Sequence, residues 1–132
     1  AARERSSAAT VVMGYCFGGA AALELARSGL GTDIAGYGSF HGGLATPEGQ
    51  AYPADTPPLL VLHGGADTAV GMDEVAAFSA ELEAAGLTYD IEVYSGAPHA
   101  FTVFGSDRYR ERADAKSWDA FQTFLVERLG SP

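Results

Sequence analysis

The sequence predicts an α/β fold in three layers, α/β/α, with helices on both faces of a mostly parallel sheet of about four strands. Short apolar segments alternate with longer segments of helical periodicity, the order typical of α/β domains. The segment PPLLVLHGG, residues 57–65, is almost continuously apolar, as strands covered on both faces are. Neither an internal repeat nor a second domain is visible, so residues 1–132 are expected to form a single domain.

The first half of the chain predicts two strands with a helix between them. Residues 10–15 and 33–40 are short, apolar and bounded by residues that favour turns, so both are expected to be strands. Residues 17–27 predict a helix with small residues on one side: Gly19, Ala22 and Ala26. Residues 42–57 include three prolines and are expected to form a loop.

The second half predicts two strands, each followed by a helix. Residues 58–63 and 89–94 have the apolar character of strands. The helix expected over residues 72–85 has apolar residues spaced i, i+3 and i+7: Val75, Phe78 and Leu82. The last helix is expected over about residues 109–128, with apolar residues at helical spacing: Trp118, Phe121, Leu125 and Leu129. Its aromatic residues are expected in the core: Trp118, Phe121 and Phe124.

Composition excludes several classes of partner. The net charge is −9 and the eight Lys and Arg residues are scattered, so nucleic acid is not an expected partner. No apolar run approaches the roughly 18 residues of a membrane span, and the start AARERSSAAT lacks the apolar stretch of a secretory signal. A single cysteine cannot form an intrachain disulfide, so the expected location is the reducing cytoplasm.

That cysteine lies in the segment GYCFGG, directly after the first strand. Small residues two before and two after a nucleophile, here Gly14 and Gly18, let a strand turn sharply into a helix and expose the side chain. The N-terminus of the following helix is expected to lower the pKa of the Cys16 thiol and to offer N–H groups to an oxyanion. A buried structural cysteine in a tight turn is the alternative interpretation.

A nucleophile of this type needs a base and an orienting acid, in the chain order nucleophile, acid, histidine. Asp67 in LHGGADTAV follows the third strand, and His99 in YSGAPHAFTVFG follows the fourth. Both loops are expected at the edge of the sheet that carries Cys16. His41 and His63 also end strands, but we interpret them as loop-shaping residues, and His41 comes too early in the chain order for the base.

Other polar residues have simpler interpretations. Asp73 and Glu74 open a helix and suit its dipole. Three arginines could reach a substrate carboxylate but are more simply the solvated start of the last helix: Arg108, Arg110 and Arg112. No cluster of His, Cys and carboxylate residues has metal-ligand spacing and no glycine-rich loop resembles a phosphate cradle, so neither metal nor cofactor is expected.

Four motifs in order resemble the C-terminal half of the dienelactone hydrolase family, within the α/β-hydrolase superfamily: GYCFGG, GYGSFHGGL, PPLLVLHGGADTAV and YSGAPHAFTVFG. The resemblance extends over about residues 10–129, beginning at the nucleophile strand, and so implies a partial, truncated α/β-hydrolase domain. It implies Cys16 as nucleophile, His99 as base, Asp67 as its orienting acid and the Phe17 backbone N–H as an oxyanion donor.

The resemblance implies hydrolysis of small carboxylic esters or lactones by a Cys-His-Asp triad. Tyr15, beside the cysteine, and Phe101, after the histidine, are the expected substrate contacts. The family's arginine four residues after the histidine is replaced by Val103, and its early strands and second oxyanion donor have no counterpart here. Two alternatives therefore stay open: a remnant that acts as a binding or assembly module, and a redox-sensing thiol.

The resemblance also implies a partner. In the family's sheet the cysteine-bearing strand lies in the interior, beside a strand that has no counterpart here. Thr10–Tyr15 would then be an unpaired apolar edge, which favours pairing with another strand. We expect a homodimer through this edge, in which a two-fold axis joins two chains into one continuous sheet.

Overall fold

The computed structural model describes residues 9–130 and contains all the predicted elements. Their order is β1 (Thr10–Tyr15), α2 (Phe17–Ser28), β2 (Ile34–Phe40), β3 (Leu59–Gly64), α3 (Met72–Ala85), β4 (Tyr89–Tyr94) and α4 (Glu111–Leu129). Every boundary lies within two residues of the one predicted from the sequence. Residues 42–57 form the expected loop, without helix or strand.

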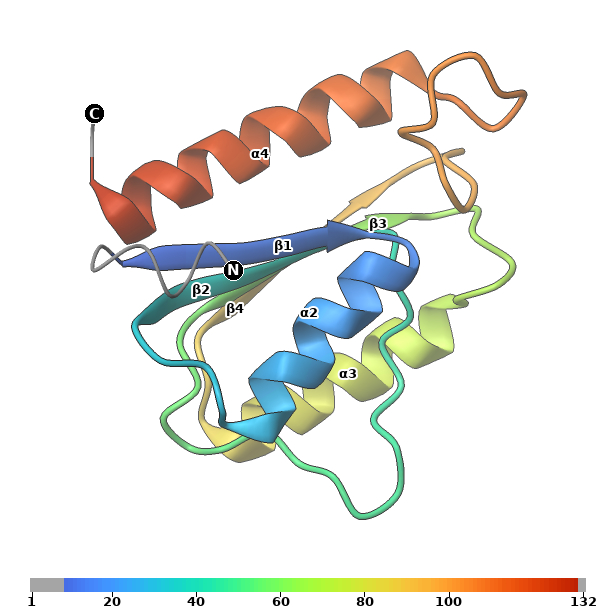
Figure 1. Cartoon of the computed structure of the whole chain (residues 1–132). Coiled ribbons are helices and arrows are strands. Elements are labelled where there is room, and N and C mark those ends of the chain that lie inside the picture. Colours follow the sequence, from blue (N-terminus) through green and yellow to red (C-terminus); the bar gives the residue numbers. More distant parts are fainter. Residues whose placement is uncertain (1–8, 131–132) are drawn as a thin grey trace.

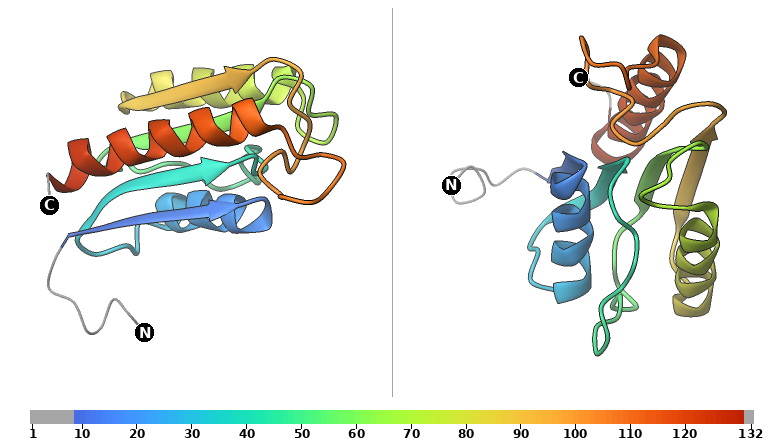
Figure 2. Two further views of the ribbon diagram at one scale, coloured as in Figure 1. Left: turned by 90° about the horizontal axis from the view of Figure 1, so that it is seen from above. Right: turned by 90° about the vertical axis from the view of Figure 1, so that its right-hand side faces the viewer.

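The four strands form one sheet in the order β1-β2-β3-β4, and every neighbouring pair is parallel. Helix α4 covers one face of this sheet, and α2 and α3 cover the other (Figure 1). Figure 2 shows the same three layers from two further directions. The predicted three-layer α/β/α architecture is confirmed, and β3, buried along its whole length, lies inside it.

Two hydrophobic clusters, one on each face of the sheet, hold the layers together. Because successive side chains of a strand point to opposite faces, Leu59 and Val61 join the cluster beneath α2 and α3, whereas Leu60 and Leu62 join the cluster beneath α4. The small and apolar residues predicted to face the sheet from α2 and α3 are buried as expected: Gly19, Ala22, Ala26, Val75, Phe78 and Leu82.

The core face of α4 differs from the predicted one. Phe121 and Phe124 are buried as expected, but Trp118 is 46% exposed, so placing it in the core is wrong. Leu129, at the same helical spacing, is 45% exposed. The other buried positions are Ala113 and Ser117, so the buried face lies one residue earlier than the sequence pattern suggests.

Two glycines of β2 account for this rotation of α4. A Cβ atom at Gly36 would lie 2.7 Å from Phe124 Cζ, and one at Gly38 would lie 3.1 Å from Phe121 Cε1. The two rings thus occupy space that side chains on β2 would otherwise fill. The helix turns the face that matches these gaps toward the sheet.

Hydrogen bonds hold the start of the loop 42–57 on α3. The backbone N–H of Leu44 donates to Glu74 Oε2 at 2.8 Å, and Thr46 Oγ1 donates to Glu81 Oε1 at 2.7 Å. Glu74, which we expected to serve mainly the helix dipole, therefore holds this loop on α3.

Strand β1 lies at one edge of the sheet. Within residues 9–130, β2 is its only neighbouring strand. Val12 packs against the cluster beneath α2 and α3, while Val11 and Met13 pack against the cluster beneath α4. The strand is thus anchored on both faces, and no other strand of the described residues pairs with its outer side. None of the helices within the described range combines the length and the apolar character needed to span a bilayer.

Candidate active site

Four polar side chains meet where the strands end. Cys16 directly follows β1, His41 follows β2, Asp67 lies in the loop after β3, and His99 lies in the loop after β4. Because all four strands are parallel, these loops lie at the same edge of the sheet (Figure 1).

Cys16 occupies a strained bend between β1 and α2. Its backbone has φ 52° and ψ −118°, and it is the N-cap residue of α2. Positive φ values are costly for residues other than glycine, and such strain is typical of functional sites. This conformation is the sharp strand-to-helix turn that the sequence predicts.

The bend depends on glycines at positions 14 and 19. A Cβ atom at Gly14 would collide with the backbone of Gly18, and one at Gly19 would collide with Ser39 Oγ. A Cβ atom at Gly18 itself would meet no heavy atom within 4 Å. The prediction is therefore confirmed for Gly14 but wrong for Gly18, because the backbone of Gly18 lies against β1 while a side chain there would meet nothing.

The predicted acid and base form a hydrogen-bonded pair. His99 Nδ1 lies 2.9 Å from Asp67 Oδ2, and the backbone N–H groups of Ala69 and Val70 each donate to Asp67 Oδ1 at 2.8 Å. Burial alone would raise the pKa of Asp67, but the hydrogen bonds from Val70 and His99 outweigh it and hold the pKa below its ordinary value. Asp67 is therefore an ionised acceptor that orients the His99 ring.

The Cys16 thiol contacts His41, a histidine that the sequence does not predict as the base. Cys16 Sγ lies 3.1 Å from His41 Nδ1, and His41 Nε2 lies 2.9 Å from Thr102 Oγ1. Burial, followed by the neighbouring His99 ring, lowers the pKa of His41 to about 4, so this ring is neutral at pH 7. His41 comes too early in the chain order for the base. It nevertheless follows β2, and the end of β2 lies at the same edge of the sheet as Cys16 and His99.

The thiol is protonated at neutral pH. Burial, followed by the Asp67 carboxylate, raises the pKa of Cys16, while the Arg108 guanidinium acts in the opposite direction. The expectation of a lowered pKa is therefore wrong for the resting site, because burial and the Asp67 carboxylate raise it.

Cys16, His41 and His99 form one compact cluster. One potential ligand atom from each side chain lies within 4.8 Å of those from the other two. No metal was expected from the spacing of these residues in the sequence; the fold brings together three loops that are far apart along the chain.

The two expected substrate contacts differ in exposure. Tyr15 is 42% exposed and stacks on Phe40, with ring centroids 4.4 Å apart. Phe101 is 0% exposed and packs edge-on against the His41 ring at 5.0 Å. Phe101 as a substrate contact is therefore wrong, because its ring is buried in the cluster beneath α4 and packs against His41.

His63 is fully buried and takes no part in the cluster. Burial lowers its pKa. Its position inside β3 supports a structural role and not a catalytic one.

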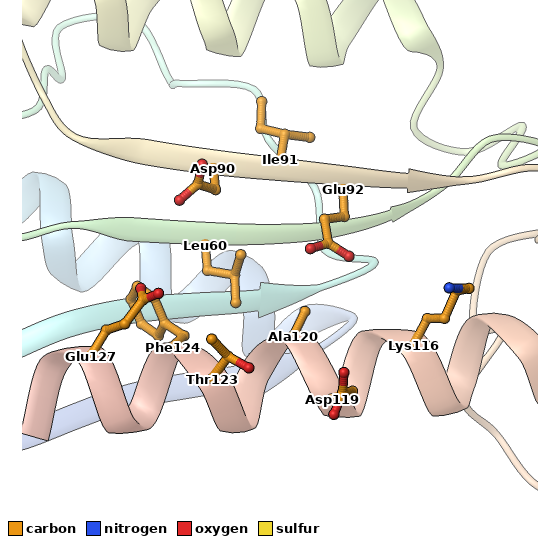
Figure 3. Close-up of a pocket in the computed structure, with 10 residues that line it drawn as sticks. All are labelled: Leu60, Asp90, Ile91, Glu92, Lys116, Asp119, Ala120, Thr123, Phe124 and Glu127. Atoms are coloured by element: carbon orange, nitrogen blue, oxygen red, sulfur yellow. The ribbon is translucent and has the colours of Figure 1, made fainter. Parts of the chain in front are cut away.

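A broad groove lies away from this cluster, between β4 and α4 (Figure 3). It has a volume of about 410 Å³, and carboxylates line it from both elements: Asp90, Glu92, Asp119 and Glu127. None of Cys16, His41, Asp67 and His99 lines it. The groove therefore does not hold a substrate against the thiol.

Comparison with known proteins is consistent with this arrangement. A family model described as "Dienelactone hydrolase family" matches residues 1–129. A Bradyrhizobium protein named "Probable 2-oxo-3-(5-oxofuran-2-ylidene)propanoate lactonase" is 28% identical over 120 residues, which are 86% of this chain and 48% of that protein. A Salmonella typhimurium protein named "Putative carboxymethylenebutenolidase" is 30% identical over 129 residues, 91% of this chain and 47% of that protein.

Among solved structures, a dienelactone hydrolase-like promiscuous phosphotriesterase from metagenomic libraries is similar, with a TM-score of 0.79 and 31% identity. The match covers 91% of this chain and 52% of that structure. The chain thus spans about half the length of the curated relatives and of the solved structure that it matches.

The glycine at position 14 is testable by a matched pair of substitutions. We expect Gly14→Ala to lower the free energy of unfolding by about 1–3 kcal/mol, because the added methyl group would collide with the Gly18 backbone. Gly18→Ala should leave stability unchanged or raise it by up to about 1 kcal/mol, since alanine favours the helix. Urea unfolding of both variants measures the difference. Equal losses in both would contradict the asymmetry.

The burial of His41 predicts a pH dependence of stability. Between about pH 6.5 and 4 the unfolded chain binds a proton that the folded chain excludes, so stability falls as the pH falls through this window. A single group with this pKa contributes about 3 kcal/mol over that range. We expect His41→Gln to have a shallower dependence in urea unfolding at a series of pH values. An unchanged slope would show that His41 is not excluded from protonation.

Proposed function

The chain belongs to the dienelactone hydrolase family, and we propose that it carries the Cys-His-Asp triad of a hydrolase acting on small carboxylic esters or lactones. The observation that carries the proposal is the Asp67–His99 pair, at 2.9 Å, facing a cysteine on a strained strand-to-helix bend. Two relatives named as a lactonase and a carboxymethylenebutenolidase support this substrate class. A cytoplasmic location, where thiols stay reduced, suits a cysteine nucleophile.

The proposed reaction begins with transfer of the thiol proton. Asp67 holds His99 Nδ1, so Nε2 is the nitrogen that accepts the proton of Cys16. The thiolate then attacks the substrate carbonyl, and the tetrahedral oxyanion is stabilised by the Phe17 N–H, which as the first amide of α2 has no partner within its helix. His99 returns the proton to the leaving alkoxide. Water, activated by His99, releases the acid from the thioester.

Before substrate binds, His41 is the hydrogen-bond partner of the Cys16 thiol. At 3.1 Å its Nδ1 accepts a hydrogen bond from the Cys16 thiol, while Nε2–H donates to Thr102. A neutral imidazole stabilises the thiol and not the thiolate, which agrees with the raised pKa of Cys16. For attack, the sulfur leaves His41 and hydrogen-bonds to His99. Catalytic hydrogen bonds are often formed only in the complex with substrate.

The Arg108 guanidinium is the candidate to recognise an anionic substrate. Its charge is close enough to Cys16 to influence the thiol, whereas Arg110 donates to the backbone carbonyls of Asp107 and Tyr109. Of these two arginines, Arg108 is therefore the better placed to attract a substrate carboxylate.

The alternatives make different demands on the same residues. A redox sensor needs a thiolate at neutral pH, and the raised pKa of Cys16 disfavours it. A binding or assembly module would retain the fold without turnover. It remains the second candidate because the chain spans about half of the relatives it matches.

Turnover of a chromogenic short-chain ester tests the triad. We expect Cys16→Ala, His99→Gln and Asp67→Asn each to lower kcat/KM, with a loss of about 10²–10⁴-fold for His99→Gln. Alkylation of Cys16, the only cysteine, should block turnover. His63→Gln is the matched control, because it removes a buried histidine outside the cluster.

Two results would overturn the assignment. Alkylation of the folded chain without any turnover would favour the binding module. Turnover that survives His99→Gln but is lost in a folded His41→Gln variant would make His41 the base.

We also propose that the 132-residue chain dimerises through the outer side of β1. The N–H groups of Thr10 and Cys16 donate toward β2, so by the alternation of a strand the N–H groups of Val11 and Met13 point outward. Two chains joined antiparallel at these groups would form one continuous eight-stranded sheet.

Sedimentation at micromolar concentration tests this pairing. We expect a dimer for the native chain and a folded monomer for Val11→Pro, because proline removes an outward N–H without breaking the ladder to β2. Amide exchange at residues 11–13 should be slow in the dimer. A monomeric native chain with fast exchange there would contradict the proposal.

A further inference from the structure

The cluster of Cys16, His41 and His99 has the donor set of a metal site. One sulfur and two imidazole nitrogens, from the ends of three different strands, lie within 4.8 Å of one another. Thiolate and imidazole together favour zinc and other thiophilic ions over magnesium or calcium, which prefer oxygen ligands. The cluster is also partly open, because the His99 side chain is 28% exposed.

The partners behind the two histidines determine which nitrogens are free. Thr102 Oγ1 binds His41 Nε2 at 2.9 Å, which leaves Nδ1 facing the cysteine. Asp67 Oδ2 binds His99 Nδ1 at 2.9 Å, which leaves Nε2. Histidines that ligate metals are typically held in this way, through the ring nitrogen that does not bind the ion.

The distances leave room for an ion after a small adjustment. Tetrahedral zinc, with bonds of about 2.3 Å to sulfur and about 2.0 Å to nitrogen, places its ligand atoms roughly 3.3–3.6 Å apart. Cys16 Sγ and His41 Nδ1 are slightly closer, at 3.1 Å, and no pair of potential ligand atoms exceeds 4.8 Å. Rotation of the partly exposed Cys16 and His99 side chains closes this difference, while His41 stays fixed.

We propose that Cys16, His41 and His99 bind one zinc ion reversibly, with water as the fourth ligand, and that the bound ion switches off the active site. On binding, the Cys16 thiol releases its proton to solvent and sulfur becomes a zinc-bound thiolate, with no change of oxidation state. The ion occupies both the nucleophile and the base nitrogen. The inhibitory part rests on the proposed hydrolase function; the binding site itself does not.

Competition between the 132-residue chain and a chromogenic zinc chelator measures the site directly. We expect one zinc ion per chain and, with cobalt in place of zinc, the near-ultraviolet absorption of thiolate-to-metal charge transfer. Thr102→Val should weaken zinc binding by about 10–100-fold, the typical loss when the partner of a ligating histidine is removed. His41→Gln should weaken it at least as much, and magnesium should not compete.

Controls separate this site from adventitious binding to a thiol. His63→Gln removes a buried histidine outside the cluster and should leave zinc affinity unchanged. Thermal unfolding shows whether each variant is folded; Thr102→Val provides the test if His41→Gln is not. Zinc binding that needs Cys16 but is unaffected in a folded Thr102→Val or His41→Gln variant would overturn the site.

Measuring ester turnover at different zinc occupancies distinguishes the proposed zinc site from the proposed hydrolase activity. Ester turnover should fall in proportion to zinc occupancy and recover on addition of a chelator. Zinc bound with the expected dependence on Thr102, in a chain without turnover, would support the site and contradict the hydrolase. Turnover that persists at full zinc occupancy would overturn the switch.

Discussion

The close approach of α2 to β1 is the contact on which the rest of the site depends. Gly14 allows the backbone of Gly18 to lie against the strand, and Cys16 takes a positive φ at the bend that this approach requires. The same turn directs α2 back over the sheet, where its buried face joins the cluster beneath it. One steric constraint therefore places Cys16, the helix terminus beside it and one layer of the fold.

The order and boundaries of the elements could be predicted because they depend on local patterns. Alternating apolar segments fixed the strands, and the spacing of Val75, Phe78 and Leu82 identified the face of α3. The face of α4 could not be predicted in the same way, since it depends on gaps left by Gly36 and Gly38 in a strand far away in the sequence. Periodicity alone does not reveal what lies opposite a helix.

The site shows the same division. Asp67 and His99 could be paired from chain order, because parallel strands bring their carboxyl ends together. The same rule brings His41, at the end of β2, to this edge of the sheet. Chain order, by contrast, does not favour His41 as the base. The raised pKa of Cys16 could not be predicted either, because it follows from burial and from the Asp67 charge and not from the helix alone. The loops that carry the site follow from sequence patterns, whereas the side-chain contacts within the cluster depend on how the loops pack together.

The contacts of two α4 rings with two glycines of β2 couple the residues allowed at these distant positions of the sequence. Gly36 receives Phe124, and Gly38 receives Phe121, each at a distance too short to admit even a methyl group without movement of the ring. A larger residue on the strand therefore requires either a shift of the ring or a smaller side chain on the helix. These positions are expected to vary as pairs among homologous chains, so that drift in β2 is limited by α4 at the opposite end of the sequence.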